Sequence, residues 1–261
     1  MRARVVEPAR GMRWIFEGCR LFLSAPVGWF AITFSYLMIT LLLSVVPLIG
    51  APLGLILYPA FTVGFLAASR ARALRQPLEL PVLFAGFRER VPQQLALGAV
   101  YIGGIVLAIL GSSLVDDGAL LRIFSRPADA GEPIVMTAET RSGALMALLL
   151  YLPTFMTTFF APVLVAWHAV RPAKALFYSF FACLLNWRAF LIYMTAGILL
   201  MVVATNVIFA LAIAIAGAEV RANPAMLFSI LVPVALFTIV PVMMTSAYVS
   251  YRDVFGAPED A

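Results

Sequence analysis

The stretch that decides the fold is residues 8–29, which read PARGMRWIFEGCRLFLSAPVGW. Its apolar side chains recur at three- and four-residue steps and so share one helix face: Met12, Ile15, Phe16, Cys19, Phe22 and Leu23. The charged side chains fall on the opposite face: Arg10, Arg13, Glu17 and Arg20. On that face Glu17 is spaced for weak surface pairing with Arg13 and Arg20. The stretch therefore predicts a helix that lies on a membrane surface and turns into a membrane span at Pro26.

The composition of the whole chain is that of a membrane protein. Of its 261 residues, 63% are hydrophobic and 12% are charged, and the mean hydropathy is +1.01. A soluble domain carries about twice that charged fraction. Long uncharged windows predict six membrane spans, at about residues 27–46, 53–69, 94–114, 144–167, 189–217 and 225–248. We therefore expect an all-α integral membrane protein, with a single membrane domain over residues 1–261.

The basic residues are distributed unevenly about these spans. Fourteen of the 18 Lys and Arg residues fall on the side of the two chain ends, and the other four are Arg122, Arg126, Arg141 and Arg221. The positive-inside rule then places both termini in the cytoplasm. The net charge of +5 comes from residues that flank apolar spans, which indicates contact with anionic lipid and not with nucleic acid. The first apolar run is too long for a cleavable signal peptide.

The six spans form three hairpins, and each hairpin follows an amphipathic stretch. The second and third stretches are residues 81–91, which Pro92 should end, and residues 172–187. Each even-numbered span also carries two prolines: Pro52 and Pro59, Pro153 and Pro162, Pro233 and Pro241. This pattern predicts a threefold internal repeat with units at about residues 8–72, 77–168 and 170–250. Its register stays open, because Cys19 can align with Cys183 or Ile15 with Leu176, and any six-span protein shows paired hairpins.

Two polar segments lie outside the spans. Residues 116–141 form an acidic insertion between spans 3 and 4, which is long enough for a small ordered lid or hairpin but carries no catalytic motif. Residues 251–261 read as a loose cytoplasmic tail. Within span 3, four glycines should let another helix approach closely: Gly98, Gly103, Gly104 and Gly111.

Prolines inside spans indicate kinked helices. Each proline removes a backbone hydrogen bond, and in lipid the freed carbonyl needs a partner such as a nearby threonine. Spans 2, 4 and 6 could then surround a groove. The candidate groove or interhelix polar residues are Asn206, Thr154, Thr157, Thr158, Tyr58 and Tyr151. The alternative is that the kinks only improve packing and that Asn206 hydrogen-bonds to a neighbouring helix.

The three basic amphipathic stretches are the main indication of function. A Lys or Arg at an anionic leaflet contributes about 1 kcal/mol to binding. The candidate contacts to lipid headgroups are Arg10, Arg13, Arg20, Arg88, Arg90, Lys174, Trp187 and Arg188. We expect membrane lipids as partners, with a membrane protein or a second copy of the chain as alternatives. The stretches could equally serve only to brace the hairpins.

The sequence offers little catalytic chemistry. No Asp, Glu, Lys or Arg lies deep in a span, which argues against an ion pump or a proton-coupled carrier. No HExxH, GxSxG, Walker or CxxC motif occurs, and His168 cannot build a metal site alone. Cys19 and Cys183 read as small apolar fillers. We therefore expect no catalytic residue, metal or cofactor, and a non-enzymatic lipid-binding protein. The alternative is a transporter or channel for an uncharged or amphipathic solute.

The chain resembles a bacterial family of six-span inner-membrane proteins. The segments that carry the resemblance are GMRWIFEGCRLF (11–22), LFAGFRER (83–90) and LLNWRAFLIY (184–193). The chain is more distantly similar to the membrane domain of some glycerophosphodiester phosphodiesterases. The resemblance implies a multi-pass, all-helical protein of the bacterial inner membrane. It implies no activity and no site residues, since the soluble phosphodiesterase domain is not present.

Overall fold

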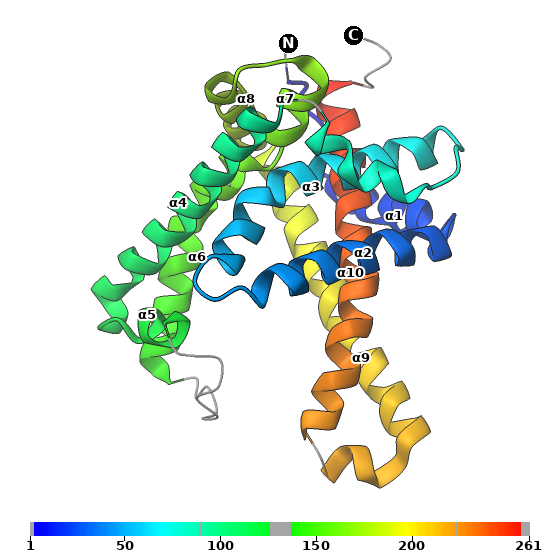
Figure 1. Ribbon diagram of the computed structural model, residues 1–261, viewed down its shortest axis with the longest axis vertical. Coiled ribbons are helices and arrows are strands. Elements are labelled where there is room, and N and C mark those ends of the chain that lie inside the picture. The colour runs from blue at the N-terminus through cyan, green and yellow to red at the C-terminus, as the bar shows by residue number, and fades with distance from the viewer. Residues whose placement is uncertain (1–2, 89, 126–136, 223, 257–261) are drawn as a thin grey trace.

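The structure is a computed structural model that describes residues 3–88, 90–125, 137–222 and 224–256, without the side chains of residues 212 and 215–233. Figure 1 shows how its helices are arranged. In chain order they are α1 (Arg10–Leu23), α2 (Pro26–Ser44), α3 (Gly50–Ala73), the 3₁₀ helix η1 (Leu80–Phe87), α4 (Val91–Asp116), α5 (Ala119–Phe124), α6 (Ala138–Thr158), α7 (Ala161–His168), α8 (Pro172–Leu185), α9 (Trp187–Ala222) and α10 (Pro224–Phe255).

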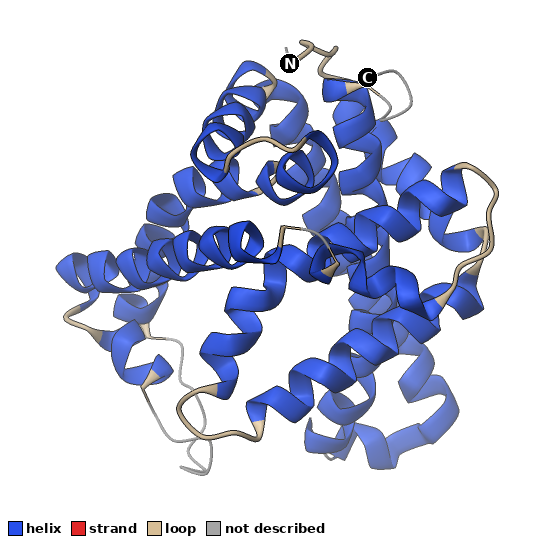
Figure 2. Ribbon diagram, turned by 45° about the horizontal axis from the view of Figure 1, so that its top comes forward, coloured by secondary structure: helices blue, strands red, loops and turns tan. Residues whose placement is uncertain are grey.

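Six stretches of helix are long and apolar enough to cross a membrane: Pro26–Ser44, Gly50–Ala73, Val91–Asp116, Ala138–His168, Trp187–Leu211 and Val234–Phe255. Each overlaps one predicted span, and the fourth combines α6 with α7. In the part of the chain that the structure describes, Figure 2 shows helices and loops and no strand. The structure thus confirms the prediction of an all-α integral membrane protein.

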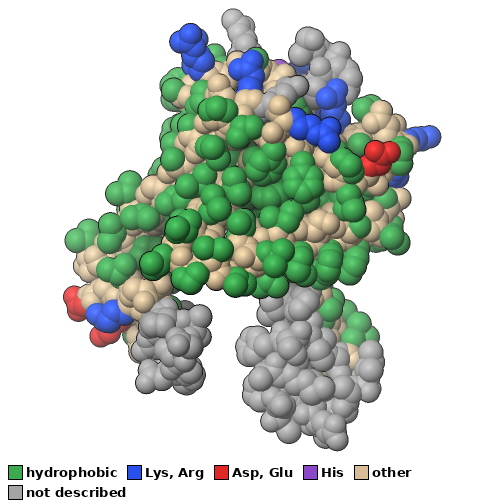
Figure 3. Space-filling view, in the orientation of Figure 1, with side chains coloured by type: hydrophobic (Ala, Val, Ile, Leu, Met, Phe, Trp, Pro, Cys, Tyr) green, Lys and Arg blue, Asp and Glu red, His purple; other side chains and the backbone are tan. Residues whose placement is uncertain are grey.

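The two ends of the molecule carry different parts of the chain. Both chain termini lie at one end in Figure 1, and α5 lies at the opposite end. Lys and Arg side chains gather at the end with the termini, and a broad band of hydrophobic side chains lies next to it (Figure 3). The acidic insertion, residues 116–141, therefore begins at the end of the molecule opposite the chain termini, in agreement with the topology predicted from the distribution of Lys and Arg. Residues 126–136 of this insertion lie outside the described residues.

The second span of each hairpin is more buried than the first. In the apolar windows of the second spans, 50% of residues are buried in α3, 33% in α6–α7 and 44% in α10, against 17% in α2, 28% in α4 and 11% in α9. The second spans therefore line the centre of the molecule, and the first spans face outward. The buried prolines Pro59, Pro162 and Pro241 all belong to these central helices.

Each interfacial element packs on the second span of the hairpin that precedes it. η1 contacts α3, and α8 contacts α6. α1 has no hairpin before it in the chain, and it contacts α10, the second span of the last hairpin. This cyclic packing supports the threefold repeat with units 8–72, 77–168 and 170–250, which stays a prediction.

Two glycines bring α1 close to the last hairpin. A Cβ atom on Gly11 would overlap the carbonyl oxygen of Ala189 in α9, and one on Gly18 would overlap Ser246 in α10. Any larger residue would therefore push the helix away. On this side α1 is held by protein, so it is more than a helix that lies on a lipid surface.

A serine from α8 is inserted into the backbone hydrogen-bond ladder of the fourth span, where α6 ends and α7 begins. The Ser179 hydroxyl accepts a hydrogen bond from the Phe160 N–H (2.9 Å) and donates one to the Met156 carbonyl (2.7 Å). These two groups would pair directly in an unbroken helix. Pro162 follows in the first turn of α7, and its carbonyl accepts a hydrogen bond from Gln94 Nε2 (3.0 Å). The break is therefore stabilised by side chains from α8 and α4.

Three local predictions were wrong. Residues 80–87 form a 3₁₀ helix, and Pro92 lies in the first turn of α4 instead of ending the preceding element, because proline fits the first turn of a helix. The expected loose tail from residue 251 is helical up to Phe255, and both Tyr251 and Val254 are fully buried. Residues 257–261 lie outside the described residues. Near the prolines, the hydroxyls of Thr62 and Thr158 bond to carbonyls within their own helices, at Tyr58 and Thr154, which are not the carbonyls that proline frees. The Thr245 hydroxyl bonds to the Pro241 carbonyl of its own helix and also to the Gly18 carbonyl of α1.

Replacing Ser179→Ala should lower the free energy of unfolding by about 1–3 kcal/mol, because it removes the partner of a buried N–H and of a partly buried carbonyl. The matched control is Ser142→Ala, at an exposed serine that bonds to the Glu139 carbonyl, and its effect should stay within about 0.5 kcal/mol. Thermal unfolding of both variants in the same detergent measures the difference. Equal melting temperatures would contradict the role assigned to Ser179.

Candidate functional site

α1 presents three faces to three environments. Trp14 and Ile15 are buried against α9 and α10. Beside them, large apolar side chains are 40%, 61% and 68% exposed, at Met12, Phe16 and Leu23 respectively. Arg13 and Arg20 are exposed on the third side. The helix thus has one face against protein, one with exposed apolar side chains and one with exposed cations. This arrangement is expected of a helix at the surface of a bilayer.

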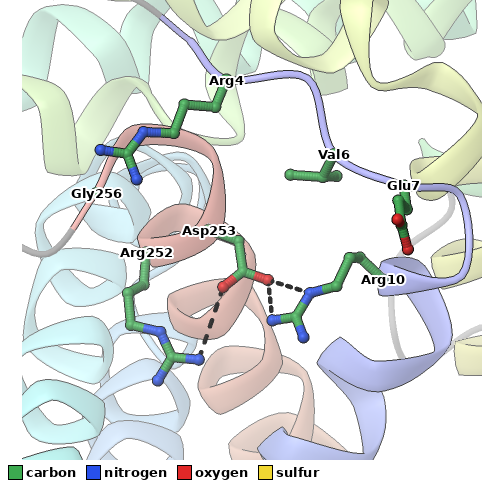
Figure 4. A pocket seen from close by; sticks show the side chains of 7 residues that line it. All are labelled: Arg4, Val6, Glu7, Arg10, Arg252, Asp253 and Gly256. Carbon is green, nitrogen blue, oxygen red and sulfur yellow. Dashed lines mark hydrogen bonds and ion pairs between the residues drawn. The ribbon is translucent and has the colours of Figure 1, made fainter.

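A carboxylate at the end of α10 holds α1 in this orientation (Figure 4). Asp253 Oδ2 accepts hydrogen bonds from Trp14 Nε1 (2.8 Å) and Arg10 Nε (2.7 Å), and it also forms an ion pair with the terminal nitrogen of Arg10. Burial lowers the pKa of Arg10, but the carboxylates of Asp253 and Glu17 outweigh that effect and raise it above its usual value. Arg10 therefore stays charged and acts as a structural partner.

Glu17 extends this network along α1. Its carboxylate lies 3.3 Å from Arg10 and 2.7 Å from Arg252 of α10. The predicted surface pairing of Glu17 with Arg13 and Arg20 was therefore wrong. Glu17 pairs with Arg10 and Arg252 instead, because α10 packs closely enough to bring Arg252 beside it. Of the four charged residues of α1, Arg10 and Glu17 thus form ion pairs with residues of α10, and Arg13 and Arg20 are exposed.

The segment before α1 is also held in place. Asn186, at the junction of α8 and α9, is 2% exposed and accepts a hydrogen bond from the Val6 N–H (2.8 Å). Its amide nitrogen donates to the Arg4 carbonyl (3.0 Å), and the Arg4 N–H donates to the Val254 carbonyl (2.8 Å). The start of the chain therefore lies between the third interfacial helix and the end of the last span.

The remaining predicted headgroup contacts are exposed at the ends of the interfacial elements. They are Arg13, Arg20, Arg88, Arg90, Lys174, Trp187 and Arg188. The guanidinium of Arg188 lies 5.4 Å from the ring centre of Trp187, so the two side chains form a cation–π pair at an exposed site. Arg10 is the exception among the predicted contacts, because it is paired with Asp253.

A partly open groove lies between α3, α4, α6, α9 and α10. Tyr58 of α3, Tyr101 of α4 and Tyr151 of α6 line one part of it, with the rings of Tyr58 and Tyr101 stacked at 4.9 Å. Tyr193 of α9 and Thr158 of α6 also line it. The structure thus brings Tyr58, Tyr151 and Thr158 together, as the groove hypothesis requires.

The other predicted groove residues lie elsewhere. A Cβ atom on Gly104 of α4 would overlap the side chain of Thr154, so this threonine is an interhelix contact. The Thr157 hydroxyl donates to the Thr154 carbonyl in its own helix. Asn206 is exposed on α9, and its Nδ2 donates to the Val202 carbonyl of the same helix (2.8 Å), not to a neighbouring helix. Of the predicted glycine contacts in α4, Gly98, Gly104 and Gly111 meet neighbouring residues, and Gly103 faces open space.

In the described part of the chain, the cysteines and acidic residues do not form a recognisable reactive centre. Burial raises the pKa of Cys183 and Cys19 above the usual thiol value, which keeps both thiols protonated at neutral pH. Among the described residues, no three His, Cys, Asp or Glu side chains are placed to share a metal ion. The expectation that the chain uses no metal and no cofactor stays a prediction.

Two residues of the network, Trp14 and Asp253, were not among the site residues predicted from the sequence. Trp14 lies at helical spacing between Gly11 and Gly18, a pattern that would have indicated a close helix contact. Asp253 is an acidic residue directly after Arg252, at a membrane border where basic residues prevail, and this unusual charge was the available signal.

Replacing Asp253→Asn should lower the free energy of unfolding by about 1.5–3 kcal/mol, because the charged acceptor of two hydrogen bonds is lost while Arg10 stays charged. Asp117→Asn is the matched control, at an exposed acid of the opposite end. Unfolding in the same detergent compares the two variants. An Asp253→Asn protein as stable as the control would show that the network does not hold α1.

Comparison with known proteins gives a relative over nearly the full length. The chain is 36% identical over 261 residues to a probable inner membrane protein of Burkholderia thailandensis, and the alignment covers 97% of this chain and 94% of that protein. No family model matches the chain, and no solved structure matches it. The comparisons give no support to the similarity with the phosphodiesterase membrane domain, which stays a prediction. The chain therefore belongs to the same family as this probable inner membrane protein.

Proposed function

We propose that the protein is a non-enzymatic inner-membrane protein that binds anionic lipid headgroups through its interfacial helices. The observation that carries this proposal is the placement of exposed cations beside exposed apolar side chains on α1. Arg13 and Arg20 border the face of Phe16, which is 61% exposed. A helix with these neighbours can insert its apolar face into the acyl region while its guanidinium groups reach phosphate.

The other interfacial elements have the same chemistry. In η1, Phe84 is 41% exposed, and exposed Arg88 and Arg90 follow it. In α8, Phe177 and Phe181 are exposed together with Lys174. Since each of these elements packs on a second span, the three could form a collar of cations around one end of the molecule. Arginine suits this task because its fork can bind phosphate through two parallel hydrogen bonds.

We further propose that this end faces the cytoplasm. The proposal rests on the excess of Lys and Arg on the side of the chain termini, where the cytoplasmic leaflet of a bacterial inner membrane supplies anionic lipid. A membrane-protein partner or a second copy of the chain could use the same exposed surface.

One observation favours the alternative function of a solute transporter: Tyr58, Tyr151 and Thr158 line the groove. Two other observations weigh against that function. Asn206 and Thr157 lie outside the groove lining, and the groove encloses about 170 Å³, below the 300–1,000 Å³ of usual small-molecule sites. Lipid binding by the interfacial helices is therefore the better-supported proposal.

The double replacement Arg13→Gln with Arg20→Gln should weaken the binding of anionic lipid. If each arginine contributes about 1 kcal/mol, the pair accounts for about a thirtyfold preference at low salt. The measurement is the ratio of phosphatidylglycerol to phosphatidylethanolamine that remains bound to the purified protein, read by native mass spectrometry. In the wild type this ratio should exceed that of the membrane, and in the variant it should fall towards it.

The matched control is the pair Arg122→Gln and Arg141→Gln, two exposed arginines at the end of the molecule that carries α5. This control should leave the lipid ratio unchanged. Equal ratios in the wild type, the variant and the control would refute headgroup binding by α1. An unchanged ratio together with loss of a co-purifying protein would favour a protein partner at this surface.

A further inference from the structure

The aromatic groove at the centre of the molecule lies apart from the interfacial cations. Its walls come from α3, α4, α6, α9 and α10, and its lining consists of four tyrosines, two phenylalanines, three methionines, two threonines and one alanine. No Asp, Glu, Lys, Arg or His is among these lining residues. An occupant that carries a full charge inside the groove would have no counter-charge there, so charge complementarity selects an uncharged group.

The volume of the groove further restricts the kind of molecule that can occupy it. Its volume of about 170 Å³ is close to the roughly 150 Å³ of an engineered apolar protein cavity that stays dry and binds benzene or xenon. A complete drug-sized solute needs about twice to six times that space. A short stretch of hydrocarbon fits, and the methionines Met194, Met243 and Met244 can adapt their shape to it.

The groove is continuous with the outward-facing surface of α9. Met194 lines the groove and is also 37% exposed, and its neighbours Leu191 and Ile198 on the same helix are 59% and 61% exposed. In a membrane these outward-facing side chains contact acyl chains. The groove therefore opens onto the lipid phase, where hydrocarbon chains are the most abundant molecules.

We propose that this groove holds one hydrocarbon chain of a membrane lipid, inserted past Met194 between α3, α4, α6, α9 and α10. The chain packs against the rings of Tyr58, Tyr101 and Tyr151, and the lipid headgroup stays outside the groove. This site rests on the groove alone and does not depend on headgroup binding by the interfacial helices.

A phospholipid with a photoreactive diazirine in the middle of its acyl chain tests the proposal. The wild-type protein is reconstituted with this lipid, irradiated and digested, and the adducts are mapped by mass spectrometry. Adducts should form on the groove segments around Tyr58 and Met243, in addition to exposed residues of α2 such as Leu41. Adducts confined to exposed faces would overturn the proposal. Labelling of the groove by a water-soluble diazirine instead of the lipid would also overturn it, by showing a hydrated solute site.

Two variants separate the groove from the general lipid surface. Ala247→Phe places a ring in the groove and should reduce the groove adducts at least about fivefold, because a filled cavity leaves no contact surface for a chain. Ala210→Phe adds the same ring at an exposed position of α9 and should leave the groove adducts unchanged. If Ala247→Phe does not fold, the wild-type map still decides the question. The Arg13→Gln and Arg20→Gln protein should keep the groove adducts, so the failure of either proposal can be told from that of the other.

Discussion

The carboxylate of Asp253 joins the first helix of the protein to the last. It accepts hydrogen bonds from Trp14 and Arg10 at a place where α1, α9 and α10 meet. Since the indole, the guanidinium and the carboxylate satisfy one another, none of them remains as an unpaired polar group at the border of the hydrocarbon layer. The close contacts at Gly11 and Gly18 then fix the rotation of α1 about its axis.

That rotation determines which side chains the protein offers to the membrane. With Trp14 directed at α9 and α10, the helical period directs Phe16 outward and leaves Arg13 and Arg20 on a separate exposed side. The contacts of η1 with α3 and of α8 with α6 follow the same plan for the other two hairpins. The second spans are thereby gathered at the centre, and the aromatic groove lies between them and the spans around them.

The sequence predicted those features that depend on local periodicity or on length. The six spans and the amphipathic α1 followed from uncharged windows and helical spacing, and the placement of Tyr58 and Tyr151 at a groove followed from the nearby prolines Pro59 and Pro153. Asp253 could not be paired with Trp14, because 239 residues separate them and spacing within one helix carries no such information. Ser179 at the break in the fourth span was missed for the same reason, since its partners belong to another helix. Tyr101 and Tyr193 could not be predicted as groove residues, because an aromatic residue in an apolar span gives the same sequence pattern whether it faces lipid, a neighbouring helix or a groove.

The depth and rotation of α1 in a bilayer are the quantities to measure, because Asp253, Gly11 and Gly18 should fix both. Spin labels introduced by Met12→Cys, Phe16→Cys, Arg13→Cys and Arg20→Cys, in a background with Cys19→Ser and Cys183→Ala, can be probed in lipid vesicles by collision with oxygen and with a water-soluble nickel complex. If α1 lies as described, labels at positions 12 and 16 should collide mainly with oxygen and those at positions 13 and 20 mainly with nickel. Equal exposure of all four labels to nickel, or burial of positions 13 and 20 away from both reagents, would contradict this orientation of α1.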